Sequence, residues 1–277
     1  MIGTIMGLMV FLAFISLFVL YWVPVMMEDN EASHMRTVID QFGDLRKMVD
    51  NQIITDNRNI TPHSPIKLGA DGVPMFERET PSELSLKLSS DFYNISFQDN
   101  GEDINENAKG GIHLTAYNRF YVRQTLVYSN GAVIISQKKG DVMKIEPTFN
   151  VEKEGNNTTL SMTLISLLHD TDDSITGIST EGVTTRLLYT DRWTYTNITS
   201  SDRMVEFHVE SRYLEVWEDY YDGILRGAGL VDGVDYRVGI MESWIGEPDY
   251  LFVEIYDVSE FSLNHAFLEA YIGRAAT

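Results

Sequence analysis

The chain begins with an uninterrupted apolar run. No charged residue occurs between Met1 and Met27, and the first basic residue of the protein is Arg36. At about 1.5 Å per residue, such a run forms a helix of about 40 Å, which exceeds the roughly 30 Å hydrocarbon core of a bilayer. The pattern therefore predicts a helix that is apolar on all sides and compatible with a membrane.

The flanks of this run bear on what kind of membrane segment it is. A secretory signal peptide has a shorter apolar core, about 7–15 residues, which follows a basic segment. An ordinary transmembrane anchor usually carries Lys or Arg on its cytoplasmic flank, and no basic residue precedes this run. Two interpretations stay open: an ordinary transmembrane anchor, or a chain from which a basic leader has been removed, so that Met1 lies near a processed N-terminus.

A narrower apolar stripe follows the uncharged run. After the acidic residues Glu28, Asp29 and Glu31, apolar side chains recur every three or four positions on an otherwise charged surface, at Met35, Val38, Phe42, Leu45, Val49 and Ile53. We predict one nearly continuous helix from about Ile2 to Ile53, with Gly3, Gly7 and Pro24 as the points where it loosens. The stripe has two alternative partners, the rest of its own chain or a neighbouring chain.

The pattern changes after residue 55. Residues 56–83 contain four of the seven prolines, which predicts a linker or an irregular crossing. From residue 84 onward, alternating apolar and polar positions separated by turn signals predict strands, with Asn130-Gly131 as a hairpin turn. Residues 211–230 are an exception, because Tyr213, Trp217, Tyr220 and Ile224 follow helical spacing and Gly227 or Gly229 can end a helix.

These elements predict an α+β fold class. A long N-terminal hydrophobic α-helix (1–55) is followed by the crossing (56–83) and by an antiparallel β-sandwich-like globular head (84–277) with one late helix. Two hundred residues suffice for a head with its own core. We therefore expect residues from about 64 to 277 to stay soluble without the helix.

Composition restricts the function classes. The chain has 41 acidic and 21 basic residues and a formal net charge of -20, so nucleic-acid phosphates would be repelled and we expect no nucleic-acid partner. Cysteine is absent, which excludes disulfides. The six histidines are scattered, and no nucleophile elbow, P-loop or zinc-binding helix motif occurs. We expect no enzyme, no catalytic or metal-ligating residues and no cofactor.

Two other patterns concern the surface. The acidic stretches 99–107 and 170–173 offer oxygen ligands that calcium accepts, but neither has the spacing of an EF-hand, and we interpret them as solvated loops. Asn-X-Ser/Thr sequons are candidate N-glycosylation sites. They occur at Asn59, Asn94, Asn156, Asn157 and Asn197. We expect Asn94, Asn156 or Asn157, and Asn197 to lie near strand ends or turns and to bear glycans on an exposed outer surface.

The sequence resembles a known family in several segments. The start "IGTIMGLMVFLAFISLFVLYWVPVMMEDNEASHM" is similar to the hydrophobic helix of archaeal type IV pilin-like proteins, in which a leader ending in basic residues is cut off before an "IGT"-type start. The order of an "HM…QF…L" helix, a "YSNGAVI" hairpin and a "YLEVWEDYYDGILRGAGL" helix resembles that of large archaeal pilin-like proteins with β-rich heads. Bacterial pilins have Glu at the fifth mature position, where this chain has Ile5 if Met1 is the first residue.

The resemblance implies a structural subunit of an archaeal type IV pilus-like extracellular filament at the cell surface, with a role in adhesion or surface attachment. Its partners would be the membrane before assembly, the pilus assembly machinery, and copies of itself in a helical homopolymer. The residues expected in the filament-core helix are Ile5, Leu8, Leu12, Ile15, Val19, Trp22, Met35, Val38, Phe42, Leu45 and Val49. The alternative is a single-span membrane-anchored β-rich ectodomain that binds a glycan or calcium, or a minor pilin of a secretion-type apparatus.

Overall fold

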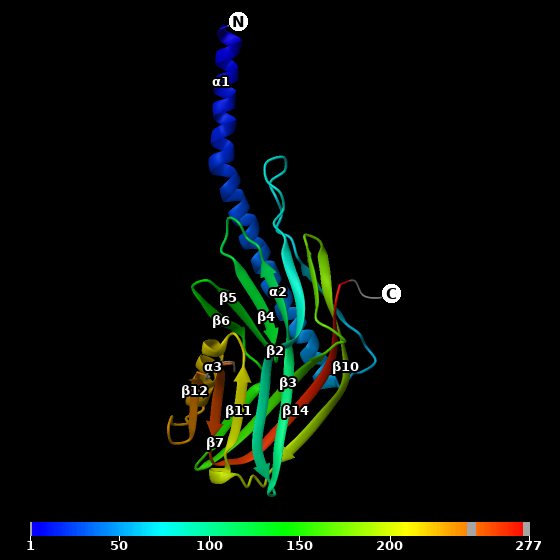
Figure 1. Ribbon diagram of the computed structural model, residues 1–277, viewed down its shortest axis with the longest axis vertical. Coiled ribbons are helices and arrows are strands. Elements are labelled where there is room, and N and C mark those ends of the chain that lie inside the picture. Colours follow the sequence, from blue (N-terminus) through cyan, green and yellow to red (C-terminus); the bar gives the residue numbers. More distant parts are fainter. Residues whose placement is uncertain (1, 243–247, 274–277) are drawn as a thin grey trace.

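The computed structural model describes residues 2–242 and 248–273. Its N-terminal part is a single helical run, in which α1 (Ile2–Leu17), a π-helical turn η1 (Phe18–Trp22) and α2 (Val23–Thr55) follow one another without a break (Figure 1). The predicted continuous helix from Ile2 to Ile53 is therefore confirmed.

The helix loosens at one of the predicted points, just ahead of Pro24. The backbone N–H of Val23 donates to the carbonyl oxygen of Phe18, five residues earlier, which is the spacing of a π-helix. Proline lacks the N–H that a regular helical turn uses, and the wider turn immediately precedes it. Gly3 and Gly7, by contrast, lie within regular α-helix.

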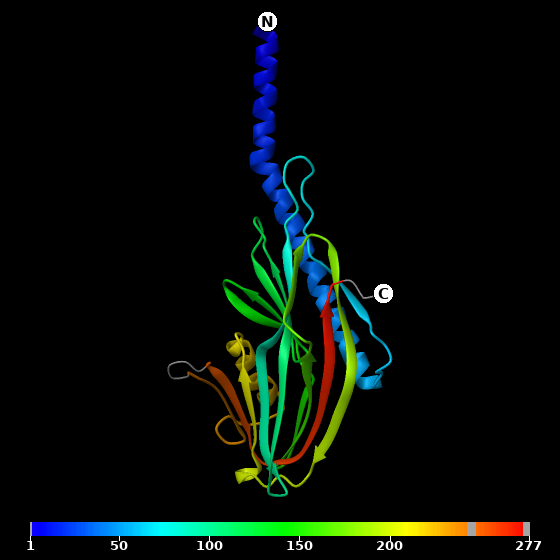
Figure 2. The same ribbon diagram turned by 45° about the vertical axis from the view of Figure 1, so that its right-hand side comes forward.

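The rest of the chain forms a β-rich head of two curled sheets with one late helix, α3 (Leu214–Gly227) (Figures 1 and 2). The smaller sheet has the order β1 (His63–Lys67), β10 (Thr180–Tyr195), β14 (Val258–Ile272), β8 (Asn157–Leu168) and β7 (Phe149–Glu154). The larger sheet has the order β12 (Tyr236–Met241), β13 (Tyr250–Ile255), β11 (Val205–Glu210), β2 (Ser82–Asp99), β3 (Glu102–Ala116), β4 (Gln124–Ser129), β5 (Ala132–Gln137) and β6 (Gly140–Ile145), and β9 (Asp173–Gly177) also pairs with β2. A short 3₁₀ helix, η2 (Ser201–Arg203), precedes β11.

The fold class predicted from the sequence is confirmed, with one departure. Among the named strands of the described residues, every pairing is antiparallel except that of β8 with β14, which is parallel. These strands are far apart in the chain, and a parallel pair requires such a long connection. Alternation within each strand predicts which face is buried but not the direction of its neighbour.

Two predicted local signals have the expected geometry. Asn130 and Gly131 both have positive φ, 45° and 79°, as a type I′ turn between β4 and β5 requires. At the end of α3, the N–H of Leu230 donates to Leu225 O and the N–H of Gly229 to Arg226 O, while Gly229 has φ of 84°. This is a Schellman motif, in which glycine adopts the left-handed conformation.

The head contains two large apolar clusters. One lies beneath α3, where Tyr221 contacts Phe207 and Phe149 and Trp217 contacts Tyr93. The other lies beneath α2 and joins residues of both sheets to the helical stripe at Met35, Val38, Phe42, Leu45, Val49 and Ile53. Every one of these stripe residues is at most 3% exposed.

The position of the stripe shows that its partner is its own chain and not a neighbouring one. It also corrects two expectations. Its side chains are covered by their own head, so Met35, Val38, Phe42, Leu45 and Val49 are not available to line a filament core between chains. The head also does not begin at residue 64 or 84, because its core includes α2. A head cut from the chain at residue 64 would lose one wall of that core.

The crossing at 56–83 is more ordered than a linker. It supplies β1, which lies at the edge of the smaller sheet, where Pro65 is tolerated because an edge strand has a free side. It then rises as a narrow loop closed by the bridges Ala70–Thr80 and Val73–Glu77. In Figure 1 this loop, drawn in cyan, extends from the head beside the N-terminal helix, near the point where the helix leaves the head.

Candidate functional site

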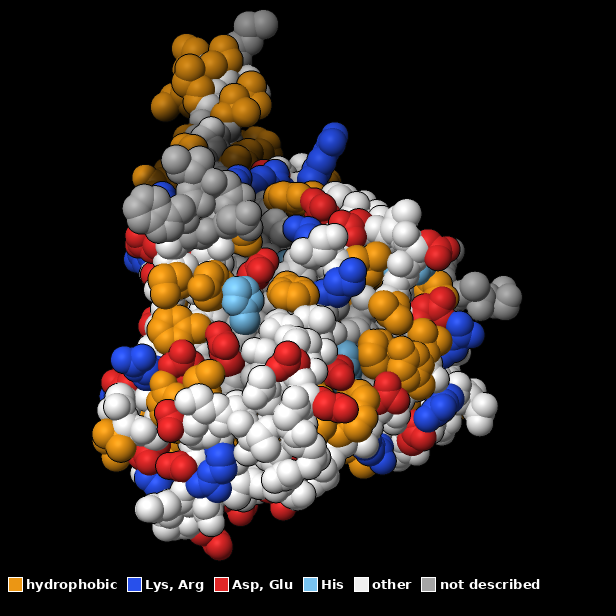
Figure 3. All heavy atoms as spheres, turned by 60° about the horizontal axis from the view of Figure 1, so that its bottom comes forward, with side chains coloured by type: hydrophobic (Ala, Val, Ile, Leu, Met, Phe, Trp, Pro, Cys, Tyr) orange, Lys and Arg blue, Asp and Glu red, His pale blue; other side chains and the backbone are white. Residues whose placement is uncertain are grey.

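The most prominent surface feature is the N-terminal part of the helix, Ile2–Trp22, which we call the projecting helix. It extends away from the head (Figure 1), and none of its most apolar 18-residue window is buried. By length and composition the helix can cross a membrane. In Figure 3 hydrophobic side chains cover it, whereas charged and polar side chains are interspersed over the head.

The predicted filament-core residues divide at this boundary. Five of them, Ile5, Leu8, Leu12, Val19 and Trp22, are exposed on the projecting helix, and Ile15 is half-buried. Burying one large apolar side chain is worth about 1.5–3 kcal/mol. A continuous apolar surface of this extent marks an interaction with lipid or with another protein.

The helix enters the head through an apolar contact. Val23 and Met27 are buried against Val73, and Phe18 and Phe120 pack at the margin. Phe18 also contacts Phe76, with ring centroids 5.2 Å apart. We call the two loops that supply these contacts, residues 68–81 and 117–123, the collar.

A buried carboxylate fixes the collar to the helix. Glu31, on α2, is fully buried and accepts hydrogen bonds from the backbone N–H groups of Arg119 (3.0 Å), Phe120 (2.8 Å) and Tyr121 (2.6 Å). The hydroxyl of Thr80 donates a further bond of 2.7 Å. Burial by itself would raise the pKa of Glu31, but these donors lower it below its ordinary value. The carboxylate therefore stays ionised although it is buried.

The role of Glu31 was not predicted from the sequence. The sequence pattern marks it only as one of three acidic residues, with Glu28 and Asp29, that precede the stripe. A signal was nevertheless present, because Met27, Glu31 and Met35 are spaced by four residues and Glu31 continues the line of the stripe toward the N-terminus. A charged residue on the buried line of a helix requires fixed donors.

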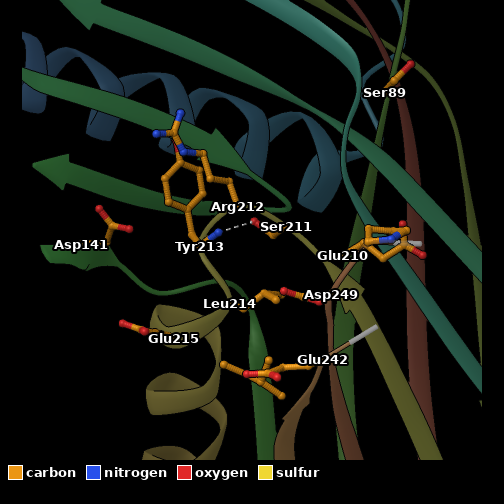
Figure 4. A pocket seen from close by; sticks show the side chains of 12 residues that line it. Ser89, Asp141, Glu210, Ser211, Arg212, Tyr213, Leu214, Glu215, Glu242 and Asp249 are labelled. Carbon is orange, nitrogen blue, oxygen red and sulfur yellow. Dashed lines mark hydrogen bonds between the residues drawn. The ribbon is translucent and has the colours of Figure 1, made fainter. Parts of the chain in front are cut away.

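The head also contains a polar cavity of about 890 Å³ (Figure 4). Its lining includes Arg212 and five carboxylates, Asp141, Glu210, Glu215, Glu242 and Asp249. In Figure 4 Asp141 and Glu215 lie on the opposite side of Tyr213 from Glu210, so these carboxylates do not converge on one point. Among the described residues, no group of three or more His, Asp or Glu side chains has the arrangement of a metal site.

A Ser–His pair near this cavity has the wrong hydrogen-bond direction for a nucleophile. Ser90 Oγ lies 3.2 Å from Nε2 of His113, but its hydroxyl donates to the carbonyl oxygen of Lys87 at 3.0 Å. A hydroxyl has one proton, so in this arrangement the imidazole donates to Ser90. Burial, with the nearby charges of Lys87 and Arg212, lowers the pKa of His113 to about 4. Neither group is set up for covalent catalysis.

The candidate glycosylation sites lie in different settings. Asn59, Asn156, Asn157 and Asn197 are exposed and lie in loops or at a strand end. Asn94 lies inside β2, half-buried, and its side-chain amide donates to Asn107 Oδ1. The expectation that Asn94 lies near a strand end is therefore corrected.

Comparison with known proteins bears on the head. The chain matches no curated protein and no solved structure. The profile of a family of unknown function, DUF7289, matches residues 85–229, which extend from β2 through α3 and cover more than half of the chain. The chain therefore belongs to the family DUF7289.

Proposed function

We propose that this chain is a structural subunit of a surface filament of the archaeal type IV pilus kind, held in the membrane before assembly and polymerised through its projecting helix. The observation that carries the proposal is that the apolar stripe of one continuous helix is covered by its own head over Met35–Ile53, whereas no residue of Ile2–Trp22 is buried. The uncovered part needs a partner outside the chain.

The absence of charge on the projecting helix fits both stages of this function. An unpaired charge in lipid costs several kcal/mol, and the same holds in a bundle of packed helices. A helix without charged residues therefore suits the bilayer before assembly and the filament core afterwards. Contact between different patches of successive subunits produces an open polymer instead of a closed ring. The acidic head, with its exposed sequons, would then form the outer surface.

The test combines electron microscopy of surface filaments with a charge placed on the helix. We expect Leu12→Asp to abolish filaments, because the carboxylate would lie in lipid or between packed helices. A matched control is Ile54→Asp, on the same continuous helix, where the side chain is 77% exposed at the far end of α2. That variant should assemble as the unaltered chain does. Normal filaments from the Leu12→Asp variant would refute the proposal.

A second candidate is a single-span membrane-anchored ectodomain with a ligand in the head. The observation that favours it is the polar cavity, where Tyr213 lies among carboxylates able to accept hydrogen bonds from sugar hydroxyl groups. Under this alternative the protein would be recovered with membranes and no filaments would form. Electron microscopy of the same cells distinguishes the two.

A further inference from the structure

The collar has an apolar tip that its own fold leaves uncovered. Met75 is 97% exposed and Phe76 is 41% exposed, next to Pro74 at the end of the loop 68–81. Two large apolar side chains at the end of a loop gain nothing from water. Phe76 contacts Phe18, so the tip is continuous with the apolar surface of the projecting helix.

Three backbone N–H groups near the tip are paired within the loop. Val73 N–H donates to Glu77 O, and the N–H groups of Phe76 and Glu77 both donate to Val73 O. This pairing matters because unpaired backbone groups are costly in an apolar medium. The carboxylate of Glu77 is likewise paired, because Arg119 Nη1 donates to it at 2.6 Å.

The position of the tip along the helix fixes its depth. Tyr21 and Trp22 have the amphipathic rings that favour the boundary between head groups and hydrocarbon, and Glu28 begins the charged part of the helix. Phe18 is four residues from Trp22 on the side away from Glu28, about 6 Å deeper at 1.5 Å per residue. Any placement of the helix that puts Phe18 in lipid therefore brings Phe76 and Met75 to a similar level.

We infer that Pro74–Phe76 is a second membrane contact, which inserts into the lipid leaflet nearest the head and sets the depth and tilt of the helix before assembly. The inference rests on the proposed membrane stage of the function. Arg78, exposed two residues after Phe76, lies where it can meet phosphate head groups while the tip enters the acyl region.

The test uses the absence of cysteine, which allows one fluorophore to be placed at a time. Full-length Met75→Cys protein, labelled with a dye whose emission depends on polarity, is reconstituted into phosphatidylcholine vesicles. Lipids with a nitroxide quencher near the head group or deep in the acyl chain report contact. Leu12→Cys is the reference for the inserted helix, and Val234→Cys, 70% exposed in the head, is the reference for water.

The expected result is that the shallow quencher removes about half of the emission at position 75 and little at position 234, since the tip lies near the interface. Position 12 should respond to the deep quencher. If position 12 is quenched and position 75 behaves like position 234, the helix is inserted but the inferred contact is wrong. If position 12 is also unquenched, membrane anchoring itself fails and the inference fails with it. If the dye at position 75 reports an apolar environment only at high protein density and without quenching, a second copy covers the tip, which also overturns the inference.

Discussion

The two halves of the N-terminal helix differ in where they find their apolar partner. The projecting helix is apolar around its whole circumference, whereas α2 from Glu31 onward presents a narrow stripe, and the head covers that stripe completely. A narrow stripe can be satisfied by one surface of the same chain. One surface of the same chain cannot cover a helix that is apolar on all sides. The distribution of apolar residues therefore distinguishes the part of the helix that packs on its own head from the part that needs an external partner.

Truncation is the strongest test of this difference. A chain beginning at Val23 should fold and remain soluble, because it lacks only the projecting helix and keeps Val23 and Met27, which are buried against the collar. A chain beginning at Asp56 should aggregate or fail to fold, because it also loses the six stripe residues of the core. Their burial is worth about 10 kcal/mol in total, comparable with the whole stability of a domain. Gel filtration and urea unfolding measure the contrast, and a stable monomer from the shorter chain would contradict it.

Two phenylalanines on the same continuous helix give a matched comparison. Phe42 is fully buried and Phe14 is 68% exposed. Replacing Phe42 with Ala should lower the free energy of unfolding of the head by about 3–5 kcal/mol, because a cavity forms in the core. Replacing Phe14 with Ala should leave it unchanged. Denaturation of the full chain in mild detergent, followed by near-ultraviolet circular dichroism, reports both values, and equal effects would break the distinction between the halves.

Glu31 lies at the boundary of the two halves and should have a smaller but clear effect. Glu31→Ala leaves three backbone N–H groups without their acceptor, and we expect a loss of about 3 kcal/mol. Glu31→Gln keeps one acceptor oxygen and should lose less. Urea unfolding gives the energies, and hydrogen exchange at residues 119–121 locates the change. A Glu31→Ala variant with unaltered protection at those amides would show that the carboxylate does not hold the collar.

Acid should affect the head and spare the projecting helix. The pKa of His113 is about 4 when folded against an ordinary value of 6.5, so between these pH values the unfolded chain binds the proton and the folded chain does not. Stability therefore falls as the pH falls through this window, by up to about 3 kcal/mol. The lowered pKa of Glu31 acts in the same direction. The free energy of unfolding of the head, measured at pH 7 and pH 4.5 with His113→Gln as control, gives the effect. An equal free energy of unfolding at the two pH values would contradict the prediction.

Much of the fold was predictable because its signals are local. The uncharged run, the Asn130-Gly131 turn and the glycine that ends α3 each act over a few residues. The partner of the stripe was not predictable, because helical spacing marks a buried face without identifying what covers it. The same holds for Glu31, whose three backbone donors are about 90 residues away in the chain. The collar tip was missed because Met75 and Phe76 lie in a proline-containing crossing without periodicity.

The alignment of α2 alongside the head has a mechanical consequence. If traction acts along the helix axis, the contacts from Glu31 to Ile53 are distributed over about 33 Å of helix and oppose the pull side by side. The contacts are loaded in shear, so many of them must break at the same time before the head can slide along the helix. A head attached only through the end of its helix would instead peel away one contact at a time. Tension along such a filament would therefore be distributed over many apolar and hydrogen-bonded contacts between α2 and the head.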